Sequence, residues 1–136
     1  MKSQPTRIYT MIAGVFLLVQ GTSTLAFRLI PSLDQTFPPL LGITKMVPPH
    51  SLLHILTGLL ALVVLWRSRA RGPFWFALGF GSFYLALALL GITTGHPVML
   101  GLQDFDHPFH ILLGVLGILS AALQTFHSQA QKEGSR

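Results

Sequence analysis

Four stretches of this chain contain no Asp, Glu, Lys or Arg for about twenty residues each, the length that a helix needs to cross the hydrocarbon core of a bilayer. They run from about residues 8 to 27, 47 to 66, 73 to 94 and 107 to 126. Prolines occur at the start of the last three, a position that a helix accepts because its first N–H groups have no partner within the helix. The pattern predicts an all-α integral membrane protein, a single domain of four transmembrane helices followed by a polar cytoplasmic tail over residues 127–136.

The composition favours a lipid environment and excludes several other classes of protein. Apolar residues make up 51% of the chain and charged residues 10%, against roughly 25% charged in an ordinary soluble domain, so the lipid bilayer is the expected partner. The formal net charge is +5, but the basic residues lie in short pieces between apolar stretches, so we expect no nucleic-acid partner. The absence of cysteine excludes disulfides, thiolate metal ligands and iron–sulfur clusters.

The basic residues also predict how the chain is oriented in the membrane. Of the nine Lys and Arg, most fall before the first stretch, between the second and third, or in the tail: Lys2, Arg7, Arg67, Arg69, Arg71, Lys132 and Arg136. The other two are Arg28 and Lys45. Because positive charge collects on the cytoplasmic side, both termini are expected in the cytoplasm, and the second and fourth helices begin at the outer surface. The first stretch has features of a secretory signal peptide, but its length favours a membrane anchor that is not cleaved.

A short motif occurs twice, 56 residues apart, as HILTG from His54 and HILLG from His110. The same shift aligns the polar residue four positions before each histidine and the glycine four positions after it: His50 and Gly58 in the first copy, Asp106 and Gly114 in the second. The repeat predicts two helical hairpins with the same orientation, related by a pseudo-twofold axis along the membrane normal, as in some transporters.

The spacing of the repeat places its polar residues on one face of each helix. Residues three or four apart are neighbours on a helix surface, so each copy forms a stripe, and His107 joins the second stripe. At a rise of about 1.5 Å per residue, His54 and His110 are expected within the outer leaflet. Ionisable groups at such a depth are costly and usually face the interior of the helix bundle.

One hypothesis gives the histidines a structural role, and the sequence alone favours it. Neutral imidazoles would donate hydrogen bonds to neighbouring helices, where the candidate partners are Gln20, Ser23, Thr24, Ser82 and Tyr84. Gly58 and Gly114 would permit close helix packing, and Asp106 would be the N-cap of the fourth helix. The protein would then be a small structural or accessory membrane protein without enzymatic activity, in a homo-oligomer or a larger membrane complex.

A second hypothesis gives them a ligand. Imidazole is a common ligand for zinc, copper and haem iron. A divalent metal ion would be bound by His50, His54, His107 and His110, with Asp106 orienting a ring from behind. In a haem variant, His54 and His110 would ligate the iron between the two hairpins, and Gly58 and Gly114 would leave room for the flat macrocycle.

A third hypothesis is transport of a small solute or proton relay, since intramembrane histidines can carry protons. It is disfavoured because no acidic residue lies inside a predicted span, and no span is visibly broken near its middle. Enzymatic hydrolysis is not expected either, because the chain has no Gly-x-Ser-x-Gly elbow and no His-Glu-x-x-His motif.

The two histidine segments carry a family resemblance. PPHSLLHILTGLLAL and DFDHPFHILLGVLGIL resemble the signature segments of a bacterial four-helix membrane family, domain of unknown function 4383, and the resemblance extends from about Met11 to Leu123. On these segments the family pattern falls on His50, His54, Gly58, Asp106, His110 and Gly114. The resemblance implies a four-helix protein of a bacterial inner membrane, of the plasma or thylakoid type. It is compatible with an accessory subunit of a larger complex and implies no particular activity.

Overall fold

The computed structural model describes residues 4–30, 32–33, 46–68, 71–94, 100–102 and 104–134. They form four helices, α1 (Pro5–Leu29), α4 (Pro48–Arg67), α5 (Arg71–Thr94) and α6 (Asp106–Glu133), with no strand among these described residues. Each helix is long and apolar enough to cross a membrane, which confirms the predicted all-α membrane fold. The proline-rich segment between the first two helices lies largely outside the described residues.

The helix boundaries differ from the predicted ones at both ends of α6. Phe105 is the N-cap residue and Asp106 is the first helical residue, so the N-cap role predicted for Asp106 is wrong. Its carboxylate still lies in the first turn, where negative charge complements the helix dipole. At the other end α6 continues to Glu133 instead of ending near residue 126. Gln, Ala, Lys and Glu in this polar segment are strong helix formers, which explains the extension.

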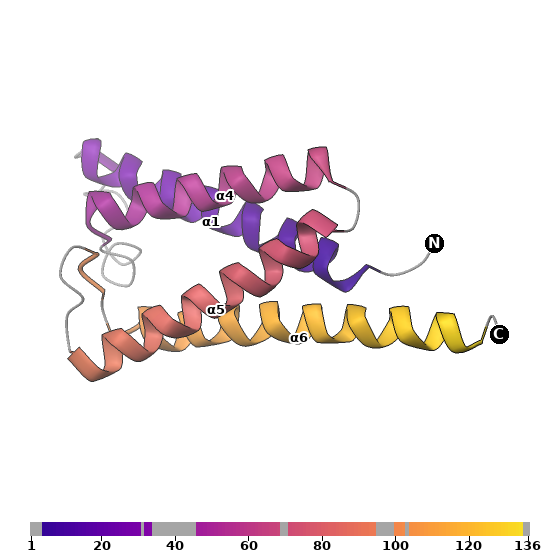
Figure 1. Ribbon diagram of the computed structural model, residues 1–136. Helices are drawn as coiled ribbons and strands as arrows, with labels where there is room; N and C mark the ends of the chain where they lie inside the picture. Colours follow the sequence, from indigo (N-terminus) through magenta and orange to yellow (C-terminus); the bar gives the residue numbers. More distant parts are fainter. Residues whose placement is uncertain are drawn as a thin grey trace.

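The helices pack as two pairs. Helix α1 makes its most extensive contacts with α4, and α5 makes its most extensive contacts with α6. Figure 1 shows the α1–α4 pair lying across the α5–α6 pair, with the start of α1 and the end of α6 at the same end of the bundle. The duplication that the sequence predicts for these two hairpins stays a prediction.

Glycines bring the two helices of each pair into close contact. A Cβ atom on Gly58 would lie 2.8 Å from the backbone oxygen of Gly14 in α1. A Cβ on Gly114 would lie 2.8 Å from the backbone oxygen of Gly81 in α5. Such small residues let membrane helices approach until their backbones touch.

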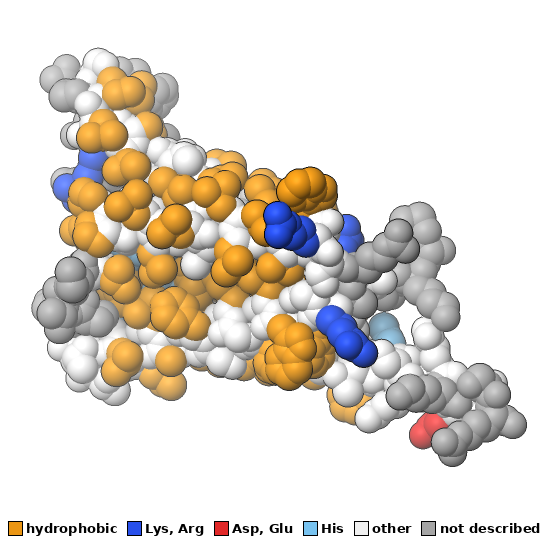
Figure 2. Space-filling view, turned by 45° about the horizontal axis from the view of Figure 1, so that its top comes forward, with side chains coloured by type: hydrophobic (Ala, Val, Ile, Leu, Met, Phe, Trp, Pro, Cys, Tyr) orange, Lys and Arg blue, Asp and Glu red, His pale blue; other side chains and the backbone are white. Residues whose placement is uncertain are grey.

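The outward faces of the helices are apolar, as expected of surfaces that meet lipid. Ile12, Leu56 and Leu89 are each more than half exposed. Figure 2 shows hydrophobic side chains over most of one face of the molecule, with basic side chains towards its two ends. We call the end with Arg7, Arg67 and Arg71 the arginine end and the opposite end, where α4 and α6 begin, the histidine end.

Polar contacts join α1 to α6 in the half of the bundle nearer the arginine end. The Tyr9 hydroxyl donates a hydrogen bond of 2.7 Å to the backbone oxygen of Leu113. The backbone N–H and the hydroxyl of Thr6 both donate to Oε1 of Gln124. These bonds connect the two helix pairs.

Candidate metal centre

Three histidines from two helices meet in the interior of the bundle near the histidine end. His50 and His54 lie on α4 and His110 lies on α6, and each side chain is fully buried. The ring centroids of His50 and His54 are 4.6 Å apart, and those of His50 and His110 are 5.7 Å apart. One ring nitrogen can be chosen from each so that all three lie within 4.8 Å of one another. We call these residues the histidine cluster.

Local sequence explains how α4 and α6 present these side chains. Pro48 and Pro49 start α4 just before His50. His50 and His54 are four residues apart, so they fall on the same face of the helix, one turn apart. Gly21 of α1 packs on this face, because a Cβ there would lie 2.9 Å from the Cβ of His54. The interior position of the cluster therefore follows from the face of α4 that is covered by α1.

Tyr84 of α5 closes one side of the histidine cluster. Its side chain is fully buried, and its ring centroid lies 4.8 Å from that of His110 and 6.2 Å from that of His54. Helix α5 thus contributes a wall to a site whose ligands come from α4 and α6.

The six ring nitrogens of the histidine cluster have no hydrogen-bond partner among the described residues, and neither does the Tyr84 hydroxyl. The backbone carbonyl of Leu100 approaches His50, and Thr57 approaches Tyr84, but neither contact has hydrogen-bond geometry. Each buried polar group left without a partner costs about 1–3 kcal/mol. Several such groups in one place are unusual in a folded protein and make the cluster a candidate ligand site.

The hydrogen bonds that a purely structural role predicts are not formed. Thr24 bonds to Ser51 at 2.9 Å and to its own helix, and the side-chain oxygen of Gln20 is itself buried without a partner. Ser23 and Ser82 are exposed on the outer surface of their helices. Among the described residues none of the predicted partners therefore forms a hydrogen bond with the histidines, although Tyr84 lies against His110 and His54.

His107, the fourth predicted metal ligand, is not part of the histidine cluster. Its ring packs against Gly91 of α5, and its Nδ1 atom is buried without a partner. Asp106, the predicted outer residue, is buried and lies close enough for its charge to act on both His50 and Tyr84. The structure therefore brings three of the four histidines together and places the acid beside them.

Gly58 and Gly114 belong to the packing within each helix pair. The backbone oxygens of Gly14 and Gly81 lie where their side chains would be, so neither glycine leaves room for a cofactor. His50 and Tyr84 also pack against both His54 and His110, with ring centroids 4.6–6.2 Å apart, so protein side chains fill the space around this pair where a macrocycle would extend. The predicted haem site does not fit this packing.

A single metal ion does fit the histidine cluster. In a tetrahedral site with metal–nitrogen bonds of about 2.0 Å, the ligand nitrogens lie about 3.3 Å apart. The ligand nitrogens of the cluster lie within 4.8 Å of one another, close to that spacing. Three imidazoles without thiolate suit zinc, copper, nickel or iron.

Sequence reasoning missed how the histidine end is covered. The segments that precede α4 and α6 pack on each other, since Gly101 lies against Val47, and both Met46 and Leu102 are buried. Gly101 has a φ of 51°, in the left-handed region that glycine adopts without strain. That a glycine stands at position 101 was the only indication of this turn in the sequence. His96 lies outside the described residues, and His127 is exposed on the part of α6 beyond the predicted span.

No protein-family model matches the chain, and no curated protein or solved structure is detectably similar to it. The resemblance to domain of unknown function 4383 therefore stays a prediction. The function has to be inferred from the geometry of the site itself.

Proposed function

We propose that this chain is a small multi-pass membrane protein that binds one transition-metal ion through His50, His54 and His110. The observation that supports this most directly is the convergence of three fully buried imidazoles whose ring nitrogens have no partner among the described residues. Binding an ion would satisfy one nitrogen of each ring. The Leu100 carbonyl approaches His50 and the charge of Asp106 acts on it, so these two groups are the candidates to orient its other nitrogen once an ion is bound.

We choose zinc and copper as the ions to test. Imidazole suits both, and Cu²⁺ has the highest affinity in the first transition row. A site of three protein ligands leaves a fourth position for water or another small ligand. We infer a binding role, in a non-enzymatic accessory protein that works alone, as a homo-oligomer or within a larger complex.

The location is part of the same proposal. The resemblance to a bacterial family supports an inner membrane, and the distribution of Lys and Arg supports an orientation with both termini in the cytoplasm. The histidine end then faces outwards, and the histidine cluster lies in the outer half of the bilayer. The ion would be acquired from the outer side.

The proposal is tested by metal analysis of the full chain, purified in detergent, exposed to Zn²⁺ or Cu²⁺ and then freed of loose metal. We expect about one ion per chain. His54→Ala and His110→Ala should each lose most of it, whereas His127→Ala, which removes an exposed histidine far from the cluster, should retain it. If the parent and the three variants retained equal amounts of metal, the proposed site would be wrong. A haem absorption band in the purified protein would support the haem hypothesis instead.

A further inference from the structure

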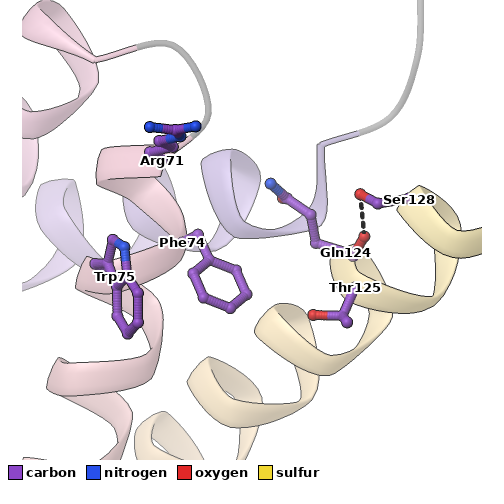
Figure 3. A pocket seen from close by; sticks show the side chains of 6 residues that line it. All are labelled: Arg71, Phe74, Trp75, Gln124, Thr125 and Ser128. Atoms are coloured by element: carbon purple, nitrogen blue, oxygen red, sulfur yellow. Dashed lines mark hydrogen bonds between the residues drawn. The ribbon is translucent and has the colours of Figure 1, made fainter.

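A second site lies at the arginine end, in a groove between α5 and α6. The groove has a volume of about 310 Å³ and is lined by Arg71, Phe74, Trp75, Gln124, Thr125 and Ser128. Figure 3 shows Phe74 and Gln124 extending into the space between the two helices, with Arg71 at the start of α5. It is separate from the histidine cluster and does not depend on the proposed metal function.

Gln124 presents hydrogen-bond donors to this groove. Its Oε1 atom already accepts two bonds from Thr6, so the orientation of the side-chain amide is fixed. The Nε2 atom makes no bond to a described residue and is the end of the side chain that extends towards α5 in Figure 3. The groove therefore has an oriented N–H donor on the α6 side.

Arg71 supplies positive charge that no described acid neutralises. It is the first residue of α5, and the groove has no acidic lining residue. The described acids near the histidine end, Asp104 and Asp106, lie at the far end of α6, and Glu133 lies more than one helical turn beyond the last lining residue. A cation and an amide donor without a competing carboxylate select an anion.

The remaining lining favours an anion that carries an apolar tail. Phe74 forms an apolar wall, and Trp75 is 66% exposed one turn into α5, the usual depth of tryptophan at a membrane interface. The hydroxyl of Ser128 donates to the backbone oxygen of Gln124, and that of Thr125 donates to Ala121, so both oxygens remain able to accept. They suit a headgroup that has hydroxyl donors of its own.

We propose that this groove binds the phosphoglycerol headgroup of an anionic phospholipid such as phosphatidylglycerol. The phosphodiester accepts hydrogen bonds from Arg71 and Gln124, and the glycerol hydroxyls donate to Ser128 and Thr125. The acyl chains lie along the apolar outer face of α5. A membrane lipid rather than free phosphate is the occupant, because aromatic and apolar side chains flank the polar groups within the bilayer interface.

The test uses fluorescence of Trp75 in the full chain with Trp66→Phe, which removes the other tryptophan. The protein is placed in phosphatidylcholine vesicles that contain a small fraction of brominated phosphatidylglycerol or, separately, of brominated phosphatidylcholine. Bromine quenches tryptophan on contact, so the difference between the two lipids measures selective binding. We expect stronger quenching by the anionic lipid, which inorganic phosphate at millimolar concentration does not reverse.

Three variants distinguish binding in this groove from a general attraction of anionic lipid to the arginine end. Arg71→Gln should lower the preference for phosphatidylglycerol about fivefold, the effect of one cation near an anionic surface, whereas Arg67→Gln at the same end should leave it unchanged. Gln124→Glu keeps an acceptor for Thr6, so the fold is retained, but it places negative charge in the groove and should abolish the preference. Equal quenching by the two lipids, equal effects of the two arginine variants, or reversal by inorganic phosphate would each overturn the proposal.

Discussion

The proposed metal binding follows from where the imidazole rings of His50, His54 and His110 are buried. A histidine is stable in a membrane interior when its ring nitrogens form hydrogen bonds or bind an ion. Among the described residues, the rings of the histidine cluster contact one another and Tyr84 but form no hydrogen bond. A metal ion is a partner that all three can share. The charge of the Asp106 carboxylate acts on His50, and in the proposed site this group would orient a ligand ring.

Asp106→Asn should weaken metal affinity without destroying the site. Removing a group that orients a ligand from behind typically costs about 10- to 100-fold in metal affinity, because the ring loses its fixed position and some of its basicity. The measurement is a Zn²⁺ competition titration against a chelator. The matched control is Asp104→Asn, which changes an exposed acid two residues away and should leave the affinity unchanged. Equal affinities for both variants and the parent would contradict this role for Asp106.

The sequence identified the members of the histidine cluster but not the exclusion of His107. Spacings of four residues place His50 with His54, and the repeat relates His54 to His110. His107 is three residues before His110, so it is displaced by about 60° around the helix, and that difference turns it towards Gly91 of α5. Which of two adjacent positions faces the cluster depends on the packing of α6 against α5, and no pattern within α6 encodes that packing.

At the scale of helices, glycines set the depth at which the histidines meet. The contacts of Gly58 with α1 and of Gly114 with α5 pull the two helices of each pair together just below the histidine cluster. The sequence predicted four helices and suggested close packing at these glycines. It did not predict the continuation of α6 to Glu133, because hydropathy marks where a helix leaves the membrane and not where it ends.

Gly58→Ala should destabilise the protein and reduce metal binding. The added methyl group would lie 2.8 Å from the backbone oxygen of Gly14, so α4 must shift away from α1 and carry His54 with it. Overpacking of this kind costs about 1–3 kcal/mol in the free energy of unfolding. Thermal unfolding in detergent, with metal content measured in parallel, checks both effects.

Gly79→Ala is the control for that experiment. A Cβ on Gly79, also in a membrane helix, would meet no atom within 4 Å. Its melting temperature and metal content should therefore match the parent, or the melting temperature should rise slightly through better helix propensity. A Gly58→Ala protein as stable and as metal-rich as Gly79→Ala would show that the contact with Gly14 does not position His54.

At the scale of the whole molecule, the two proposed sites lie at opposite ends. The histidine cluster lies near the histidine end, and the headgroup groove lies at the arginine end between α5 and α6. The start of α1 and the end of α6 share the arginine end, as four crossings require (Figure 1). The proposed orientation places the groove in the cytoplasmic leaflet and the cluster in the outer one.

The orientation is tested by reporter fusions in a bacterial host. A phosphatase that is active only outside the cytoplasm, fused after Arg136, should be inactive, and a fluorescent protein that folds in the cytoplasm should be bright at the same position. Replacing Arg67, Arg69 and Arg71 together by Gln should weaken this bias, because that link carries three of the seven bases on the cytoplasmic side. An active phosphatase on the unaltered chain would place the histidine cluster in the inner leaflet.

The central claim, one ion held by three histidines, is tested most directly by electron paramagnetic resonance of the Cu²⁺-loaded protein with resolved nitrogen couplings. We expect one copper per chain with three imidazole nitrogens in the parent, His107→Ala and His127→Ala, whereas His110→Ala should lose most of the copper and show two nitrogens on what remains. A spectrum of aqueous or loosely bound copper, or one that the His50, His54 and His110 variants do not alter, would contradict it.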